Sequence, residues 1–248
     1  MNETLKIMVR SKEENNYKTR NIVLMILFMF GALLLQLILF FCFAGRLDIL
    51  RAWTFFSVEF IYGIIWSVTL YKFFPEVLEM RSQLGKGSEP WEKILPVSYA
   101  IVGWFVQMIV MAWDIGVYRW TNLTPFVLLI CSIIGYTLLV FCRLLGNWAM
   151  IENRHFEWTA RIQEDKGHEV ITTGPYKYIR HPGYASTIGY QISLILIFGS
   201  IAGSIPALIA SFIFVVRTYF EDKMLKEKLD GYMEYSQKVK YRLIPGIW

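Results

Sequence analysis

Charged residues are scarce in this chain. They make up 18% of the 248 residues, whereas hydrophobic residues make up 55%. A soluble domain usually carries about 25% charged residues. The three cysteines lie inside apolar segments and show no Cys-x-x-Cys spacing, which argues against a disulfide scaffold or a cysteine-based metal site; they are Cys42, Cys131 and Cys142. The scarcity of charge therefore excludes an ordinary soluble domain.

The apolar residues come in blocks of about 20 or more. An α-helix of about 20 residues spans the roughly 30 Å hydrocarbon core of a bilayer. The blocks are residues 22–44, 52–74, 96–117, 123–150 and 184–216. The last block carries no charge, is too long for one span and is interrupted by Gly199, Gly203 and Pro206, so it predicts a hairpin of two short helices.

These blocks predict an all-α, polytopic transmembrane helical bundle with about six spans, or five if one block is re-entrant or two merge. The C-terminal hairpin is followed by an amphipathic tail. The first block is too long for the apolar part of a cleaved signal peptide and shows no small-residue cleavage site, so a retained signal-anchor is expected.

The distribution of Lys and Arg predicts the orientation of the spans. Of the 25 Lys and Arg residues, 22 lie in segments 1–21, 72–95, 143–183 and 217–248. Since cytoplasmic loops carry an excess of Lys and Arg, both termini are expected in the cytoplasm. The net charge of +5 fits this topology and attraction to anionic headgroups, so no nucleic-acid partner is expected.

Two polar clusters flank the charge-free hairpin. Residues 174–184 combine a Gly-Pro turn with Tyr176, Arg180, His181, Pro182 and Tyr184. Residues 217–222 place Arg217 and Glu221 four apart, on one face of a helix. Each cluster alone reads as an interfacial anchor or a surface salt bridge. Because a hairpin returns the chain to the side it left, the two clusters are expected to form one pocket at the lipid boundary.

The residues of these clusters resemble the isoprenylcysteine carboxyl methyltransferases and the related phospholipid methyltransferases. The matching motifs run in order over roughly residues 147–245: they are Gly174 to Tyr184, Arg217 to Leu225, Tyr232-Met233-Glu234-Tyr235 and Arg242-Leu243-Ile244-Pro245. Upstream, Asn153 to Phe156 and Arg161 to His168 resemble a bacterial branch. The chain departs from the pattern at Asp222, where Glu is usual, and at Gly231, which sits next to Tyr232.

The resemblance implies S-adenosylmethionine-dependent methyl transfer to a lipophilic acceptor from the bilayer. It divides the chain into scaffold helices, 1–122, and a catalytic region, 123–248. It implies that Arg217 aims an acceptor carboxylate and that Glu221 faces the sulfonium. The cofactor site would comprise Gly174, Tyr176, Arg180, His181, Pro182, Tyr184 and Glu221.

Carboxyl O-methylation of an isoprenylcysteine-like acceptor is the first expectation. The alternatives are N-methylation of a phospholipid or other amine, an NADPH-dependent sterol-type reductase, and a non-enzymatic membrane scaffold. The reductases share an Arg-His-Pro-Asn-Tyr motif, but position 183 here is Gly. An amine acceptor would need Glu221 or His181 as a base.

Four further polar residues stand apart from these motifs. Glu59 and Asp114 lie within apolar spans, where a charge is costly and usually functional. Glu59 is expected to pair with a basic neighbour or stay protonated, and Asp114 to lie at the outer interface; a direct substrate role is the alternative for each. His155 and His168 are expected to be surface groups, since no further ligand lies at metal spacing, and no metal site is predicted.

Overall fold

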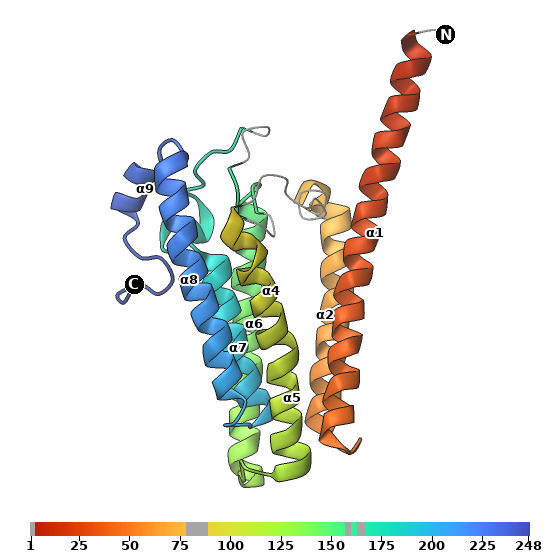
Figure 1. Cartoon of the computed structure of the whole chain (residues 1–248), viewed down its shortest axis with the longest axis vertical. Helices are drawn as coiled ribbons and strands as arrows, with labels where there is room; N and C mark the ends of the chain where they lie inside the picture. The colour runs from red at the N-terminus through yellow and green to blue at the C-terminus, as the bar shows by residue number, and fades with distance from the viewer. Residues whose placement is uncertain (1–2, 78–88, 157–159, 163–166) are drawn as a thin grey trace.

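The computed structural model is a bundle of long helices (Figure 1). It describes residues 3–77, 89–156, 160–162 and 167–248, and no β-strand occurs in those ranges. Parts of the basic connector 72–95 and of the motif 161–168 therefore lie outside the described residues. The long helices are α1 (Glu3–Ala44), α2 (Leu50–Phe73), α6 (Pro125–Glu152), α7 (Pro182–Phe198) and α8 (Ser204–Lys228).

The third long segment is built from consecutive helical pieces of different winding. They are η1 (Pro90–Lys93), α4 (Leu95–Tyr99), η2 (Ala100–Val106), α5 (Gln107–Ala112) and η3 (Trp113–Tyr118). The pieces η2 and η3 are π-helical. Two short elements, η5 (Gly174–Lys177) and α9 (Tyr232–Lys238), complete the chain.

Five helical segments within the described residues are long and apolar enough to cross a membrane. They are Thr19–Ala44, Leu50–Phe73, Pro90–Tyr118, Pro125–Glu152 and Ser204–Lys228. The sixth segment, α7, has 17 residues, or about 25 Å of helix, which is less than a typical hydrocarbon core. The all-helical transmembrane class and the C-terminal hairpin are confirmed.

The hairpin differs from the prediction in its proportions. Two short helices were expected within 184–216, but α8 has 25 residues and continues to Lys228. Hydrophobicity marks only the part of a helix that lies in lipid. The remainder of α8 is polar, and it carries Arg217, Glu221 and Asp222 beyond the apolar block.

The helices alternate in direction, so the connections gather at the two ends of the bundle. The short connections between α1 and α2, between η3 and α6, and between α7 and α8 lie at the lower end in Figure 1. The N-terminus, α9 and the segment that precedes α7 lie towards the opposite end. That this end faces the cytoplasm stays a prediction.

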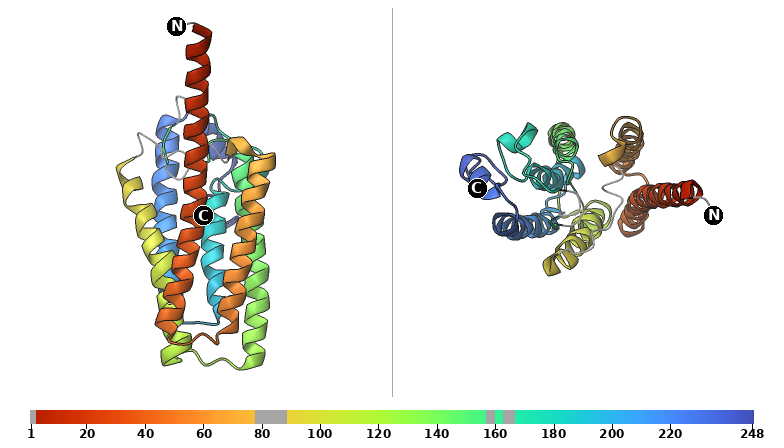
Figure 2. Two further views of the ribbon diagram at one scale, coloured as in Figure 1. Left: turned by 90° about the vertical axis from the view of Figure 1, so that its right-hand side faces the viewer. Right: turned by 90° about the horizontal axis from the view of Figure 1, so that it is seen from above.

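Helix α7 lies near the centre of the bundle when it is viewed end-on (Figure 2), and small residues let it approach α6 closely. A Cβ atom added to Gly135 would lie 2.8 Å from the backbone nitrogen of Ile197. One added to Gly189 would lie 2.5 Å from the Cys142 sulfur. Both distances are shorter than real contacts, so glycine is required for this packing.

Aromatic rings join α7 to the first two helices. Phe198 at the end of α7 packs against Phe40 of α1 and Phe55 of α2, each with ring centroids 5.2 Å apart. All three side chains are fully buried. The lower end of the bundle therefore has a continuous apolar core.

Asp114 fastens the same end of the bundle by hydrogen bonds. Its fully buried carboxylate accepts from the backbone and hydroxyl of Thr121, both at 2.7 Å, and from the hydroxyl of Ser200 at 2.6 Å. It thus links the end of η3 to the turn of the α7–α8 hairpin. Hydrogen bonds to neighbouring turns satisfy this buried side chain. Asp114 lies at the end of the bundle that holds the α7–α8 turn, and its place at the outer membrane interface stays a prediction.

Glu59 and Arg143 form an ion pair between α2 and α6. This confirms the expectation that Glu59 pairs with a basic neighbour. The Glu59 carboxylate is buried, and the Arg143 guanidinium lies over the rings of Tyr62 and Tyr190, at 4.8 and 4.5 Å. Tyr62 also donates a hydrogen bond to Asn147. Each charge compensates the other inside the membrane, so neither is left unpaired.

We expect Glu59→Gln to destabilise the protein, because it leaves the guanidinium of Arg143 in an apolar setting without a counter-ion. The expected loss is about 3–5 kcal/mol. Unfolding of the detergent-purified protein measures it, and a Glu59→Leu/Arg143→Leu double variant should recover most of the loss. Arg46→Gln, which breaks the exposed Arg46–Asp48 pair, is the control and should have no measurable effect. Equal behaviour of Glu59→Gln and Arg46→Gln would contradict the assignment.

Candidate functional site

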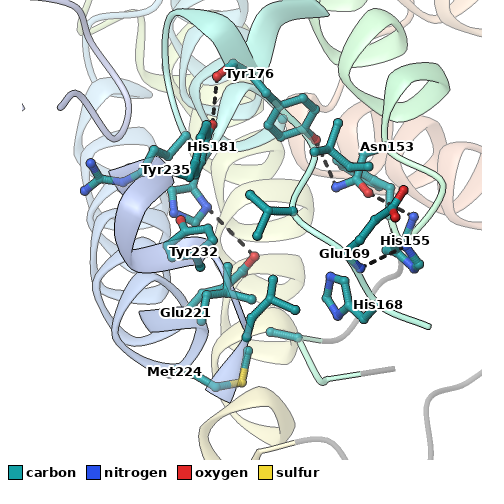
Figure 3. A pocket seen from close by; sticks show the side chains of 18 of the residues that line it. Asn153, His155, His168, Glu169, Tyr176, His181, Glu221, Met224, Tyr232 and Tyr235 are labelled. Carbon is teal, nitrogen blue, oxygen red and sulfur yellow. Dashed lines mark hydrogen bonds and ion pairs between the residues drawn. The ribbon is translucent and has the colours of Figure 1, made fainter. Parts of the chain in front are cut away.

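A cavity opens at the end of the bundle where α7 begins and the polar part of α8 lies (Figure 3). It contains about 810 Å³ of empty space, including the part open to solvent. Its walls come from residues that follow α6, from η5, and from α7, α8 and α9. The polar and aromatic side chains that line it include Asn153, His155, His168, Tyr176, Arg180, His181, Tyr184, Glu221, Tyr232 and Tyr235.

The cavity brings together five of the residues predicted from the two polar clusters. Tyr176, Arg180, His181, Tyr184 and Glu221 all line it. The remaining three predicted residues are adjacent to it and are not among its lining: they are Gly174, Pro182 and Arg217. The hairpin thus places the two clusters side by side, and the roles assigned to these residues stay predictions.

A rigid turn leads the chain into this site. Gly174 has a φ of +54°, in the left-handed region that favours glycine, and an added Cβ would lie 2.7 Å from Glu152. The turn presents Tyr176, whose buried hydroxyl donates to the carbonyl of Ala149 and accepts from Asn153. Burial raises the pKa of Tyr176, so its hydroxyl stays protonated. Gly174 and Tyr176 therefore shape the cavity from behind.

Asp222 gathers the polar side chains beneath the cavity. Its carboxylate is 1% exposed and accepts from Arg180 at 2.7 and 3.2 Å, from Tyr232 at 3.0 Å and from Arg242 at 3.0 Å. Lys226, one helical turn further on, lies at 3.0 Å. The carboxylate therefore binds α8 to the C-terminal tail.

The guanidinium of Arg180 donates its hydrogen bonds to other parts of the chain. Its Nε and one terminal nitrogen donate to Asp222, and the other nitrogen donates to the carbonyls of Ser236, Val239 and Lys240 at 3.3, 2.6 and 3.0 Å. The backbone nitrogens of Arg180 and His181 donate to the carbonyls of Tyr241 and Arg242. In this structure Arg180 thus fastens the tail while also lining the cavity.

An acidic and aromatic surface forms where α7 and α8 meet. The ring of His181 stacks on that of Tyr184 with centroids 5.6 Å apart and 5° between the planes. Tyr184 donates a hydrogen bond to Glu221, and the His181 Nδ1 lies 3.8 Å from the same carboxylate. The Glu221 side chain is 19% exposed. A carboxylate beside aromatic faces attracts a cation.

Arg217 lies behind this surface, bound to a residue that the sequence did not indicate. Its guanidinium donates two hydrogen bonds of 2.8 Å to Glu92 of η1 and lies over the ring of Tyr184 at 5.0 Å. Both side chains are buried. In the sequence, Glu92 is only an acidic residue shortly before an apolar block. Such residues are too common for this position to indicate a functional role.

The wall opposite Glu221 contains two histidines. His155 is 7% exposed, and its ring lies 4.5 Å from that of His168, which is partly buried. The expected surface position of His155 is therefore wrong, because the segment after α6 folds back over the cavity. No group of three or more potential metal ligands occurs in the part of the chain that the structure describes.

Tyr232 and Tyr235 also line the cavity from α9, although the sequence marked them only as part of a motif. Both are buried, and Tyr235 donates to the carbonyl of Tyr176. The described lining contains no serine, threonine, cysteine or lysine. The described lining offers acidic and aromatic side chains to a ligand.

Comparison with known proteins finds a match to one family in the same part of the chain. Residues 133–227 match the model of the isoprenylcysteine carboxyl methyltransferase family. The resemblance stated from the motifs is thereby confirmed over these residues, which include all of α7, most of α6 and nearly all of α8.

Two relatives show the extent of the similarity. One is the protein-S-isoprenylcysteine O-methyltransferase B of Arabidopsis thaliana, 26% identical over 108 residues, which are 42% of this chain and 55% of the relative. The other is the protein-S-isoprenylcysteine O-methyltransferase of Saccharomyces cerevisiae, 25% identical over 150 residues, which are 57% and 59%. The chain thus spans little more than half the length of either relative.

A solved structure of a eukaryotic intramembrane Ras methyltransferase aligns with the whole of this chain and 88% of its own. The identity is 18% and the TM-score is 0.48.

We expect the histidine-bearing wall to lose stability as the pH falls. Burial, with His155 and Arg161 nearby, lowers the pKa of His168 from 6.5 to about 4. Between these values the unfolded chain takes up a proton that the folded protein does not, so the free energy of unfolding decreases from pH 6.5 towards pH 4. Melting temperatures of wild type and His168→Gln across this range test it: the variant should show a shallower decline, and parallel curves would contradict the assignment.

Proposed function

We propose that this chain is an integral membrane, S-adenosylmethionine-dependent methyltransferase that O-methylates the carboxylate of an isoprenylcysteine-like acceptor. The observation that carries the proposal is the Glu221 carboxylate on the cavity wall, beside the stacked rings of His181 and Tyr184. The match of residues 133–227 to the methyltransferase family supports it, as do the names of the two relatives.

The side chains that line the cavity suit S-adenosylmethionine in their chemistry. A sulfonium favours a carboxylate and aromatic faces, which Glu221, His181 and Tyr184 provide. The His181 ring lies between two carboxylates, with its Nδ1 3.8 Å from Glu221 and its Nε2 3.6 Å from Asp222, so its position beside the cavity is fixed.

When bound, S-adenosylmethionine supplies a methyl group attached to a positively charged sulfur, which a carboxylate can attack directly. The chain must then bring the two reactants into line and exclude water. Glu221 and the rings of His181 and Tyr184 hold the positive charge. Arg217 is the residue proposed to orient an acceptor carboxylate, which needs no general base. Because its guanidinium is bound to Glu92 behind the ring of Tyr184, it would act on the acceptor through the position of that ring. Arg180 acts as a positioning residue through Asp222.

The lipid boundary explains how the acceptor reaches the site. Helix α8 is long and apolar enough to cross a membrane, and the cavity lies beside its polar end, where α7 begins. An acceptor with an apolar chain and a small anionic head can therefore keep its chain in the bilayer while its head enters the cavity.

The activity is tested by incubating the purified protein with S-adenosylmethionine labelled on its methyl group. A prenylcysteine mimic and total membrane lipids serve as separate acceptors. We expect label on the prenylcysteine mimic and its release by base, because esters are base-labile. Base-stable label on lipid amines would instead indicate N-methylation, and binding of NADPH in place of S-adenosylmethionine would indicate a reductase.

Removal of the charge of Glu221 should weaken donor binding. We expect Glu221→Gln to raise the Kd for S-adenosylmethionine about tenfold, because a nearby carboxylate no longer compensates the sulfonium. His181→Ala should weaken it as well. Glu227→Gln is the matched control, since Glu227 lies on the same helix and is exposed at 58% of its side chain. Calorimetry measures the constants, and unchanged affinity in both site variants would move the donor site elsewhere.

Arg217 should matter for turnover more than for donor binding. Arg217→Gln is expected to lower kcat for the prenylcysteine mimic about 100-fold, since a misplaced acceptor loses alignment, with no loss of affinity for S-adenosylmethionine. Single-turnover kinetics and calorimetry on the same preparation separate the two effects. Equal losses in both would reassign Arg217 to the donor.

A further inference from the structure

Three contacts dock the short η1 segment on helix α8 beside the cavity. Glu89 lies 2.5 Å from Lys228, the ring of Trp91 stacks on Phe220 at 5.8 Å, and Glu92 binds Arg217. The segment precedes the third span and lies outside residues 133–227, which match the methyltransferase family. A part of the chain predicted to be scaffold therefore reaches the site.

The contact between Glu92 and Arg217 has the geometry of a fixed pair. The guanidinium donates from Nε to Oε1 and from a terminal nitrogen to Oε2, each at 2.8 Å. The two side chains are 0% and 8% exposed. Two parallel hydrogen bonds hold both the position and the plane of a guanidinium, which a single contact does not.

The pair is connected to the cavity through one aromatic ring. The Arg217 guanidinium lies 5.0 Å from the centre of the Tyr184 ring, and the Tyr184 hydroxyl donates to Glu221. Glu92, Arg217, Tyr184 and Glu221 thus form a continuous series from η1 to the cavity wall. A shift of the first member would move the ring that supports the last.

The charges along this series set the charge that a ligand meets. Glu92 and Arg217 cancel each other at 2.8 Å. Among the described residues, Glu221 has no ion pair of that kind, and its nearest basic neighbour is the His181 Nδ1 at 3.8 Å. Without Glu92, the guanidinium of Arg217 would instead compensate Glu221 across Tyr184. In a partly buried site such a change of one charge alters ligand affinity strongly.

We propose that Glu92 is a positioning residue of the methyl-transfer site, which fixes Arg217 for the acceptor and cancels its charge so that Glu221 stays available to the cationic donor. The inference rests on the proposed function. In this role, Glu92 makes the site prefer S-adenosylmethionine, which carries the sulfonium charge, over S-adenosylhomocysteine, which has lost that charge. The same residue therefore also favours release of the spent donor.

The test compares Glu92→Gln with Glu89→Gln, a change in the same segment at an exposed ion pair. Calorimetry measures the Kd of S-adenosylmethionine and of S-adenosylhomocysteine for each purified protein. We expect Glu92→Gln to raise the Kd of S-adenosylmethionine and to change the Kd of S-adenosylhomocysteine less, so that the preference for S-adenosylmethionine falls about tenfold. Glu89→Gln should behave as wild type. If Glu92 had a merely structural role, Glu92→Gln would weaken the binding of both ligands alike, and that result would overturn the inference.

A double variant, Glu92→Gln/Arg217→Gln, separates charge from orientation and removes the unpaired buried charge if Glu92→Gln does not fold. We expect the preference for S-adenosylmethionine to return to within about twofold of wild type, because the net charge is restored, while transfer to the prenylcysteine mimic stays lost. Recovery of transfer, or no recovery of the preference, would overturn the inference. A wild type that binds neither ligand would instead refute the proposed function.

Discussion

The carboxylate of Asp222 is the contact on which the geometry of the site depends. It is almost fully buried, and cationic and hydroxyl groups from the segment before α7, from α8, from α9 and from the C-terminal tail meet on it. Since a buried carboxylate is stable only with such partners, the elements that supply them are held together. The acidic and aromatic wall of the cavity is built directly on this arrangement, because Glu221 and His181 are the sequence neighbours of Asp222 and Arg180.

The sequence predicted the helical class and the pairing of the two polar clusters, because both follow from short-range patterns. Apolar blocks mark the spans, and a charge-free hairpin must return its ends to one side. The partners of individual charges could not be predicted in this way. Arg217 and Glu92 are 125 positions apart, and their contact depends on how the third span packs against α8. The length of α8 was underestimated for a related reason, since its polar end has no hydrophobic signal.

Polar residues inside the spans divide into two groups by what they contact. Asp114 and the Glu59–Arg143 pair are satisfied by neighbouring helices and turns, far from the cavity lining. Glu92 and Arg217 are satisfied by each other and touch the cavity through Tyr184. A charge within a membrane span thus indicates function only after its partner is known. The division of the chain into scaffold and catalytic region at residue 122 stays a prediction.

The central position and short length of α7 have a consequence for biogenesis. Its 17 residues include Gln191 and Ser193, both fully buried, and make a helix too short to span a typical bilayer by itself. Its close glycine contacts are with α6, which is synthesised just before it and is strongly apolar. During synthesis at the membrane, α7 would therefore enter the lipid against a partner already in place, and the completed hairpin would close only when α8 has left the ribosome.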